Sequence, residues 1–322
     1  MANCHYLFQQ FNADIKLSDG KVKSLRSSRN AVRKKIREYF RNKGNGFVPK
    51  FHGQGSFMMG TIVRPSDGEF DIDDGVYFLV SQKPDQTIET LHRWISEAVE
   101  GHTDEPPQDK NTCVRVRYAN HYHIDLPIYY RINGECPKLA HKAKGWIDSD
   151  PREFISWFRG YTDTKGQLRR IIRYLKAWRD SKSGKLPSGL ILSILATQNV
   201  QFNDRDDIAF LNTLYRVQRQ LAWNFSCYRP TTPTNEDLLV SCSQTDKNYF
   251  LTQLHSLVEA LEKATHSQTT PEQASKILCK HLGSRFPTPD YDHVDTSLMS
   301  EAYQPKSVFI SGRPANAPRG FA

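Results

Sequence analysis

The chain has 322 residues, of which 38% are hydrophobic and 25% are charged, and its formal net charge at pH 7 is +9. This length allows two domains, and the composition is that of an ordinary soluble globular protein. No apolar stretch is long enough to span a bilayer, and the first residues lack the basic flank and apolar run of a secretory signal, so we expect neither a membrane span nor secretion.

The net charge indicates which partners the protein could bind, and the cysteine spacing indicates its cellular compartment. The excess of cations favours polyanionic partners, namely nucleotides, nucleic acid or an anionic membrane surface, and does not choose among them. The six cysteines are scattered, without a C-x-x-C pair or a zinc-like spacing. We therefore expect reduced thiols and a cytoplasmic location.

The first predicted element is a basic helix over residues 19–43, which Gly44 is expected to end. Its cations, among them Arg29 and Arg33, either face solvent on a packing helix or bind phosphate, and the sequence leaves both interpretations open. The apolar stripe that predicts the helix consists of Val22, Leu25, Val32, Ile36 and Phe40.

A region that mixes strands and helices follows. The patterns predict a helical turn over residues 56–61 and an amphipathic helix over 87–100. Strands are predicted over residues 47–51, 70–80, 113–118 and 122–130. These elements indicate an α+β lobe over residues 1–150, with a mixed or antiparallel central sheet.

From residue 151 the pattern changes to helices. Pro151 suits the first turn of a helix, where its missing N–H costs nothing. Further helices are predicted over residues 168–178, 190–200, 208–221, 250–261 and 271–282. We expect a helical lobe over residues 151–302 that packs on the first lobe, and a flexible tail over residues 303–322, where apolar periodicity is poor.

One turn and the strand after it carry the most informative motif of the chain. The small residues Gly55 and Ser56 open a short helix, and Asp71 and Asp73 follow on a predicted strand. Side chains alternate across a strand, so these two carboxylates project from one face and Asp74 from the other. Two acids beside a turn rich in backbone N–H groups can hold a magnesium ion and a triphosphate together, as nucleotidyl transfer requires.

A third carboxylate, Asp125, lies on the predicted strand over residues 122–130. Three acids from two neighbouring strands could ligate one or two Mg²⁺ ions. With two ions, one activates a ribose hydroxyl for in-line attack on the α-phosphorus of a nucleoside triphosphate, and the other neutralises the leaving pyrophosphate. Asp125 would orient that hydroxyl or accept its proton.

A competing metal set shares this strand. His121, His123 and Asp125 alternate along it, and such a set could hold zinc or non-haem iron. We favour the acids, because Asp71 and Asp73 already supply hard oxygen ligands. The two histidines are expected to pack or to surround the ligands.

Several short motifs within residues 50–200 resemble a known family. They are Gln54-Gly55-Ser56, Gly60-Thr61, Arg64-Pro65, Asp71-Ile72-Asp73-Asp74-Gly75, His123-Ile124-Asp125-Leu126-Pro127, Gly145–Pro151, Leu175–Asp180 and Leu186-Pro187-Ser188. Through them the chain resembles the bacterial cGAS/DncV-like nucleotidyltransferases (CD-NTases), which belong to the DNA polymerase β-like superfamily. Within that family it looks most like the DncV-like cyclic GMP–AMP synthases.

The resemblance implies a polymerase β-like catalytic lobe and an enzyme that makes a cyclic dinucleotide such as cGAMP for anti-phage (CBASS) signalling. The expected substrates are ATP and GTP, joined first into a linear intermediate and then into a ring, with Mg²⁺ as cofactor and Mn²⁺ as a substitute. By matching position, Asp71, Asp73 and Asp125 would hold the metals. The matching nucleotide-binding positions are Gln54, Gly55, Ser56, Arg115, Ser149, Asp150, Lys176 and Ser188.

From the residues alone, some of these positions have simpler interpretations. Ser149 could be a helix cap, Arg115 could pair with a strand carboxylate, and Lys176 could be a solvated cation on a helix. The sequence leaves these alternatives open.

The resemblance also implies partners. Family members are often encoded beside ubiquitin-transfer-like enzymes that conjugate the C-terminus, here Ala322, although an ordinary frayed end explains that segment equally well. Nucleic acid is expected only as an activator. Two other functions stay open: a nucleotidyltransferase that extends RNA or modifies a small acceptor, and a nucleic-acid-binding module with a decayed site.

Overall fold

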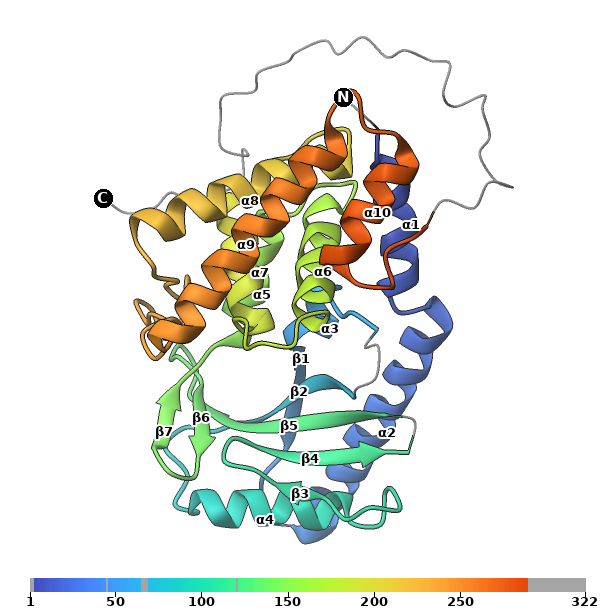
Figure 1. Cartoon of the computed structure of the whole chain (residues 1–322). Coiled ribbons are helices and arrows are strands. Elements are labelled where there is room, and N and C mark those ends of the chain that lie inside the picture. The colour runs from blue at the N-terminus through green and yellow to red at the C-terminus, as the bar shows by residue number, and fades with distance from the viewer. Residues whose placement is uncertain (1–2, 45, 65–68, 120, 289–322) are drawn as a thin grey trace. The chain divides into compact units, whose positions relative to one another are not determined.

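The computed structural model describes residues 3–44, 46–64, 69–119 and 121–288, and the predicted tail over residues 303–322 lies outside them. The chain forms two compact units (Figure 1). A strand-rich unit consists of Lys16–Arg159 and Tyr228–Leu238, and a helical unit consists of the remaining described residues. None of the described helices combines the length and the apolar character needed to cross a membrane.

The strand-rich unit is built on one mixed sheet (Figure 1). Its strands lie in the order β1-β2-β5-β4-β3, β6 also pairs with β5, and β7 pairs with β6. The neighbours β2 and β5 are parallel and the other strand pairs are antiparallel. The strands are β1 (Pro49–Gln54), β2 (Phe70–Leu79), β3 (Gln108–Asp109), β4 (Cys113–Tyr118), β5 (Tyr122–Arg131), β6 (Lys138–His141) and β7 (Gly145–Asp148). The predicted α+β class with a mixed sheet is confirmed.

Helix α2 (Asp19–Lys43) has the bounds that its sequence pattern predicts. The Ser18 hydroxyl accepts a hydrogen bond from the backbone N–H of Lys21 and so caps the first turn. Gly44, with φ of 63°, ends the helix in the left-handed conformation that glycine adopts without strain. The other helices of this part of the chain are α3 (Gly55–Met59), α4 (Ile88–Val99) and α5 (Pro151–Gly160).

One face of the sheet forms an apolar core with α2 and α4. Ile72 and Val76 of β2 and Ile124 of β5 belong to it, because the period of two places even-numbered residues of these strands on one face. The helices contribute Leu25, Val32, Ile36, Leu91 and Ile95. The odd-numbered residues of β2 and β5 therefore lie on the opposite face.

Asp74 is a charged residue on the apolar face. Its side chain is 0% exposed, and Arg33 of α2 donates two hydrogen bonds to its carboxylate, at 2.6 and 2.5 Å. This two-pronged pairing offsets the loss of hydration that burial imposes on the carboxylate. The prediction that Asp74 points away from the face of Asp71 and Asp73 is confirmed, and this arginine of the basic helix serves packing.

The helical unit contains α1 (His5–Ile15), α6 (Gln167–Asp180), α7 (Gly189–Asn199), α8 (Asp206–Trp223), α9 (Gln244–Thr265) and α10 (Pro271–Leu282). Every residue of α6 from Ile171 to Trp178 is buried, so α6 is the centre of this unit. The sequence pattern predicts α6, α7, α8 and α10 within two residues of their bounds, whereas α9 begins six residues before and ends four residues after its predicted range. It does not predict α1, whose apolar residues include Leu7, Phe8 and Phe11.

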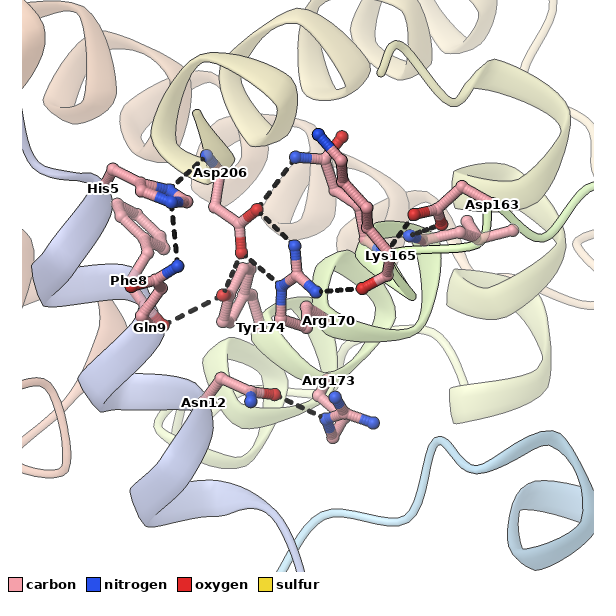
Figure 2. Close-up of polar contacts among 12 residues, drawn as sticks. His5, Phe8, Gln9, Asn12, Asp163, Lys165, Arg170, Arg173, Tyr174 and Asp206 are labelled. Atoms are coloured by element: carbon pink, nitrogen blue, oxygen red, sulfur yellow. Dashed lines mark hydrogen bonds and ion pairs between the residues drawn. The ribbon is translucent and has the colours of Figure 1, made fainter. Parts of the chain in front are cut away.

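Figure 2 shows how α1, α6 and α8 meet around the carboxylate of Asp206, which is 0% exposed. Arg170 donates to it at 2.5 and 2.8 Å, and Gln167 donates at 2.8 Å. The hydroxyl of Tyr174 lies 2.8 Å from the same carboxylate. The backbone N–H of Asp206 donates to Nδ1 of His5 in α1, at 2.9 Å. The network ties the first helix to the centre of the unit.

This network makes the stability of the helical unit sensitive to acid. Burial by itself raises the pKa of Asp206, but hydrogen bonds from Arg170, Gln167 and Tyr174 outweigh it and hold the pKa below its ordinary value. A carboxyl with a lowered pKa in the folded state stabilises the fold above its unfolded-state pKa of about 3.9, and that contribution disappears as the pH falls through the folded-state pKa.

We expect Asp206→Asn to lower the free energy of unfolding by about 2 kcal/mol at pH 7, because the charge-assisted hydrogen bonds are lost while the shape is kept. The difference between wild type and variant should shrink steadily as the pH falls below about 4. Thermal unfolding of both proteins between pH 3 and pH 7 measures this. Two parallel curves would show that the carboxylate charge contributes nothing.

Candidate active site

The face of the sheet opposite the core carries polar side chains from the four neighbouring strands β1, β2, β5 and β4. The parallel register places Asp71 opposite His123 and Asp73 opposite Asp125. Residues opposite one another in a ladder project from the same face, so these four side chains are neighbours. In the antiparallel pairs, Gln54 of β1 faces Asp73, and Arg115 of β4 faces Asp125.

Three of these side chains gather closely enough to hold a metal ion. One ligand atom from each of Asp71, His123 and Asp125 lies within 4.8 Å of the others. Asp71 is exposed, whereas His123 and Asp125 are buried. Two carboxylate oxygens and one imidazole nitrogen are a donor set that suits a divalent cation. The residues present therefore fit a divalent cation, but the third member of this group is His123 and not the predicted Asp73.

The carboxylate of Asp73, a residue of β2, lies against Gly55, the first residue of α3. A Cβ built on Gly55 would meet Oδ2 of Asp73 at 2.0 Å, and Gly55 has φ of +67°. Glycine is thus required here twice, for the backbone conformation and for the close approach of the carboxylate. The motifs Gly55-Ser56 and Asp71-Ile72-Asp73, separate in the sequence, meet at this point.

Replacing Gly55 by alanine is expected to lower the rate of the predicted nucleotidyl transfer by about 10²-fold, because the new methyl group displaces the carboxylate of Asp73. The control is Gly101→Ala, since Gly101 has φ of +63° but nothing within 4 Å of the place that a Cβ would take. Both variants carry a backbone strain of about 1–2 kcal/mol. Initial rates and melting temperatures of the two variants separate the clash from the strain. Equal rates would show that the approach of Asp73 does not matter.

Arg115 is committed to Asp125. Its Nε donates to one carboxylate oxygen at 2.7 Å and its Nη2 to the other at 2.8 Å. These hydrogen bonds raise the pKa of Arg115, so the guanidinium stays charged. The interpretation of Arg115 as the partner of a strand carboxylate is confirmed, and this pairing holds Asp125 in one orientation.

Gln54, at the end of β1, is buried, and its Nε2 donates to the hydroxyl of Tyr129 at 3.3 Å. Its Oε1 has no hydrogen-bond partner within the described part of the chain. A buried amide oxygen without a partner leaves an acceptor available beside the turn. Ser56 follows within α3, and its carbonyl accepts the backbone N–H of Thr61 at 2.9 Å.

Ser149 and Asp150 lie between β7 and α5 of the strand-rich unit. Oδ1 of Asp150 accepts the backbone N–H groups of Arg152 and Glu153, at 3.0 and 3.4 Å. Asp150 therefore caps α5, and it is one of the three residues before Pro151, with Asp148 and Ser149, whose side chains could serve as the cap. The backbone N–H of Ser149 donates to the carbonyl of Pro137 at 3.1 Å.

Lys176 and Ser188 lie together in the helical unit. Lys176 is 9% exposed, and its Cε would be 3.3 Å from a Cβ built on Gly189. Ser188 caps α7 by accepting the backbone N–H of Ile191 at 3.4 Å. The interpretation of Lys176 as a solvated cation is wrong, since burial of a lysine among helices needs specific surroundings.

The competing set of His121, His123 and Asp125 is wrong as predicted. His121 has φ of 56° and lies in the turn before β5, so it does not share the strand face. His123 does join a group of possible ligands, but with Asp71 as the third member. The alternation of His123 with Asp125 is visible in the sequence, whereas the register that sets Asp71 opposite His123 is not.

A sheet with acids on one face and helices on the other, beside a glycine turn, is the architecture of a nucleotidyltransferase. Two family models match the chain: "Cyclic GMP-AMP synthase DncV-like, nucleotidyltransferase domain" over residues 49–129, and "Cyclic GMP-AMP synthase, C-terminal domain" over residues 165–293. The chain belongs to the DncV-like nucleotidyltransferase family.

Curated relatives and solved structures agree with this assignment. A cyclic GMP-AMP synthase of Escherichia albertii is 30% identical over 61% of this chain and 46% of the relative, and one of Vibrio cholerae is 25% identical over 53% of this chain and 52% of the relative. The chain thus matches about half the length of these two relatives. The crystal structure of Vibrio cholerae DncV cyclic AMP-GMP synthase matches with a TM-score of 0.77, at 21% identity, over 89% of this chain and 98% of that one. This likeness shows the fold.

Proposed function

We propose that the protein is a divalent-metal-dependent nucleotidyltransferase that joins two nucleoside triphosphates into a cyclic dinucleotide. The observation that carries the proposal is the meeting, on one sheet face, of a group of metal-ligating side chains and a glycine turn. Asp71 and Asp125 belong to that group, and the turn at Gly55 lies against Asp73. The family assignment and the relatives described as cyclic GMP-AMP synthases support the same activity.

In the proposed reaction, a ribose hydroxyl attacks the α-phosphorus of a nucleoside triphosphate, the bond to the β-phosphate breaks, and pyrophosphate leaves. A bound Mg²⁺ ion, or Mn²⁺ in its place, would acidify the hydroxyl and neutralise charge on the phosphates. Asp71, Asp73 and Asp125 supply the negative charge that holds such ions. Asp125 orients the attacking hydroxyl, and Arg115 keeps that carboxylate in place through two hydrogen bonds.

The remaining predicted residues have proposed roles in nucleotide binding. Gly55 and Ser56 let the triphosphate approach the backbone, and Gln54 offers its unpartnered Oε1 beside the turn. In the helical unit, Lys176 and Ser188 form a small polar group suited to phosphate oxygens. The positions matched by resemblance further include Ser149 and Asp150.

The proposed substrates are ATP and GTP. One structure of Vibrio cholerae DncV is described in complex with the linear intermediate 5′ pppA(3′,5′)pG, and a second structure of the same protein is described in complex with nonhydrolyzable GTP. For this chain we propose the same order of events, a linear intermediate followed by ring closure. We further propose that the protein acts in anti-phage (CBASS) signalling. We also propose that a ubiquitin-transfer-like enzyme conjugates it at Ala322, which lies outside the described residues.

The test is incubation of the full chain with α-labelled nucleoside triphosphates and Mg²⁺, without any acceptor. A phosphatase-resistant product, identified by mass spectrometry as a cyclic dinucleotide, supports the proposal. Label that appears only when RNA or a small acceptor is added overturns cyclisation and leaves a different nucleotidyltransferase. No incorporation under any condition, together with salt-sensitive nucleic-acid binding, favours a binding module.

A further inference from the structure

We propose that His123 is itself a ligand of the metal centre, and that this nitrogen ligand makes the centre prefer Mn²⁺ to Mg²⁺. The inference rests on the metal centre of the proposed function and goes beyond it, because the ligands proposed there are the three carboxylates Asp71, Asp73 and Asp125. It is carried by three features of His123: its register, its burial and the lack of a hydrogen-bond partner at Nε2.

The register of β2 and β5 places His123 beside Asp71 and Asp125. β2 and β5 are parallel, and Asp71 and His123 are directly opposite one another. Asp125 lies two residues further along β5, on the same face as His123. The ligand atoms of the three side chains lie within 4.8 Å of one another. At metal–ligand distances of about 2.0–2.1 Å, opposite ligands of an octahedral ion are about 4.0–4.2 Å apart and neighbouring ligands about 3 Å, so the three side chains draw closer together to close around a metal.

The burial of the His123 ring indicates that it binds a metal ion. The residue is 5% exposed, and Nε2 has no hydrogen-bond partner among the described residues, while Nδ1 has only the carboxylate of Glu69 near it, at 3.4 Å. A buried polar group left without a partner costs about 1–3 kcal/mol. Coordination of a metal by one ring nitrogen removes that cost, which is a physical reason for a histidine at this position.

A nearby carboxylate can orient the ring. Nδ1 of His123 lies 3.4 Å from Oε2 of Glu69, and Glu69 itself accepts a hydrogen bond from Arg117 at 2.5 Å. Ligating histidines in proteins commonly have a carboxylate at the edge of the ring, which fixes the ring and raises its basicity. Glu69 therefore belongs to the surroundings of the centre rather than to its ligands.

The chemistry of the donor set decides the preference among ions. Both Mg²⁺ and Mn²⁺ favour oxygen ligands, but Mn²⁺, as a transition ion, tolerates an imidazole nitrogen better than Mg²⁺ does. Exchanging one oxygen for a nitrogen therefore weakens Mg²⁺ binding relative to Mn²⁺. Asp71 and Asp125 keep the site hard enough for both ions, and His123 sets the ratio of their affinities.

The experiment uses Mn²⁺ alone, added to the full chain, and pulsed electron paramagnetic resonance to detect nitrogen bound to the ion. We expect ¹⁴N coupling in the wild type, and its replacement by ¹⁵N coupling when histidine is supplied with ¹⁵N. This second measurement needs no substitution, so it does not depend on whether a variant folds.

The variant for the affinity measurement is His123→Asn, and its matched control is His121→Asn, because His121 precedes the same strand at φ of 56°, a conformation that asparagine also adopts. We expect His123→Asn to abolish the nitrogen coupling and to raise the Kd for Mn²⁺ about tenfold, while the Kd for Mg²⁺ changes less than threefold. The control should behave like the wild type in both measurements.

The outcomes separate this inference from the proposed function. Mn²⁺ that binds without nitrogen coupling, or with coupling that survives His123→Asn, overturns the role of His123 even if cyclic product forms. Failure of the chain to bind Mn²⁺ overturns this inference and the proposed metal centre together. Nitrogen coupling that depends on His123, in a protein that makes no cyclic product, upholds the inference and rejects the proposed function.

Discussion

The substitution Asp71→Asn is expected to lower the rate of cyclic dinucleotide formation by about 10³-fold, with little effect on the fold. Asp71 is exposed and belongs to the group of possible metal ligands. Removing its charge weakens the hold on a cation that contributes several kcal/mol to the stabilisation of the transition state. Asp71 is a sharper test than Asp125, because loss of the Asp125 carboxylate would also leave Arg115 without its partner.

The matched control is Asp85→Asn. Asp85 is exposed and follows β2 beyond the end of the strand opposite to Asp71, so the same loss of charge occurs away from the site. Initial rates at saturating nucleotide, together with circular dichroism of both variants, measure the effect. Nearly equal rates for the two variants would show that Asp71 takes no part in the reaction.

Replacing Arg33 by methionine is expected to lower the free energy of unfolding of the strand-rich unit by about 3–5 kcal/mol. The substitution leaves the carboxylate of Asp74 buried, with its side chain 0% exposed, and without the two hydrogen bonds that Arg33 donates to it. An uncompensated charge among apolar side chains is among the costliest single changes a protein can carry. Urea denaturation followed by tryptophan fluorescence measures the loss.

Two further variants identify the cause. Arg26→Met changes an exposed arginine of the same helix and should alter stability by no more than about 0.5 kcal/mol. The double variant Arg33→Met/Asp74→Leu removes both charges and should recover much of the lost stability. A double variant as unstable as Arg33→Met would contradict the explanation, because it would locate the cost in the packing of the arginine side chain.

The pair also links stability to the proposed chemistry. Asp73 and Asp74 are consecutive residues of β2 and lie on opposite faces of the sheet. Arg33 binds Asp74 on the core face and so fixes β2, whose other face carries Asp71 and Asp73. A buried anchor on one face can thus keep the acids of the other face in place. Of the three acids on β2, Asp71 and Asp73 therefore face the proposed metal site, and Asp74 faces the core.

Local patterns account for most of the secondary structure. The bounds of α2, β4 and α10 match the predicted ranges 19–43, 113–118 and 271–282. In each case the determinant is local: an apolar period, a capping glycine, or a proline in the first turn. The same period of two predicts, without any fold, that Asp71 and Asp73 share a face and that Asp74 does not.

The sequence by itself therefore determined the α+β class, most elements, and the acids and glycine turn of the candidate site. Only the tertiary structure decided which residues meet: His123 opposite Asp71, Arg115 on Asp125, Arg33 on Asp74, and α1 on the helical unit. The physical reason is that periodicity and capping are properties of neighbouring residues, whereas strand register and the pairing of buried charges depend on contacts between residues far apart in the chain, which no local pattern encodes.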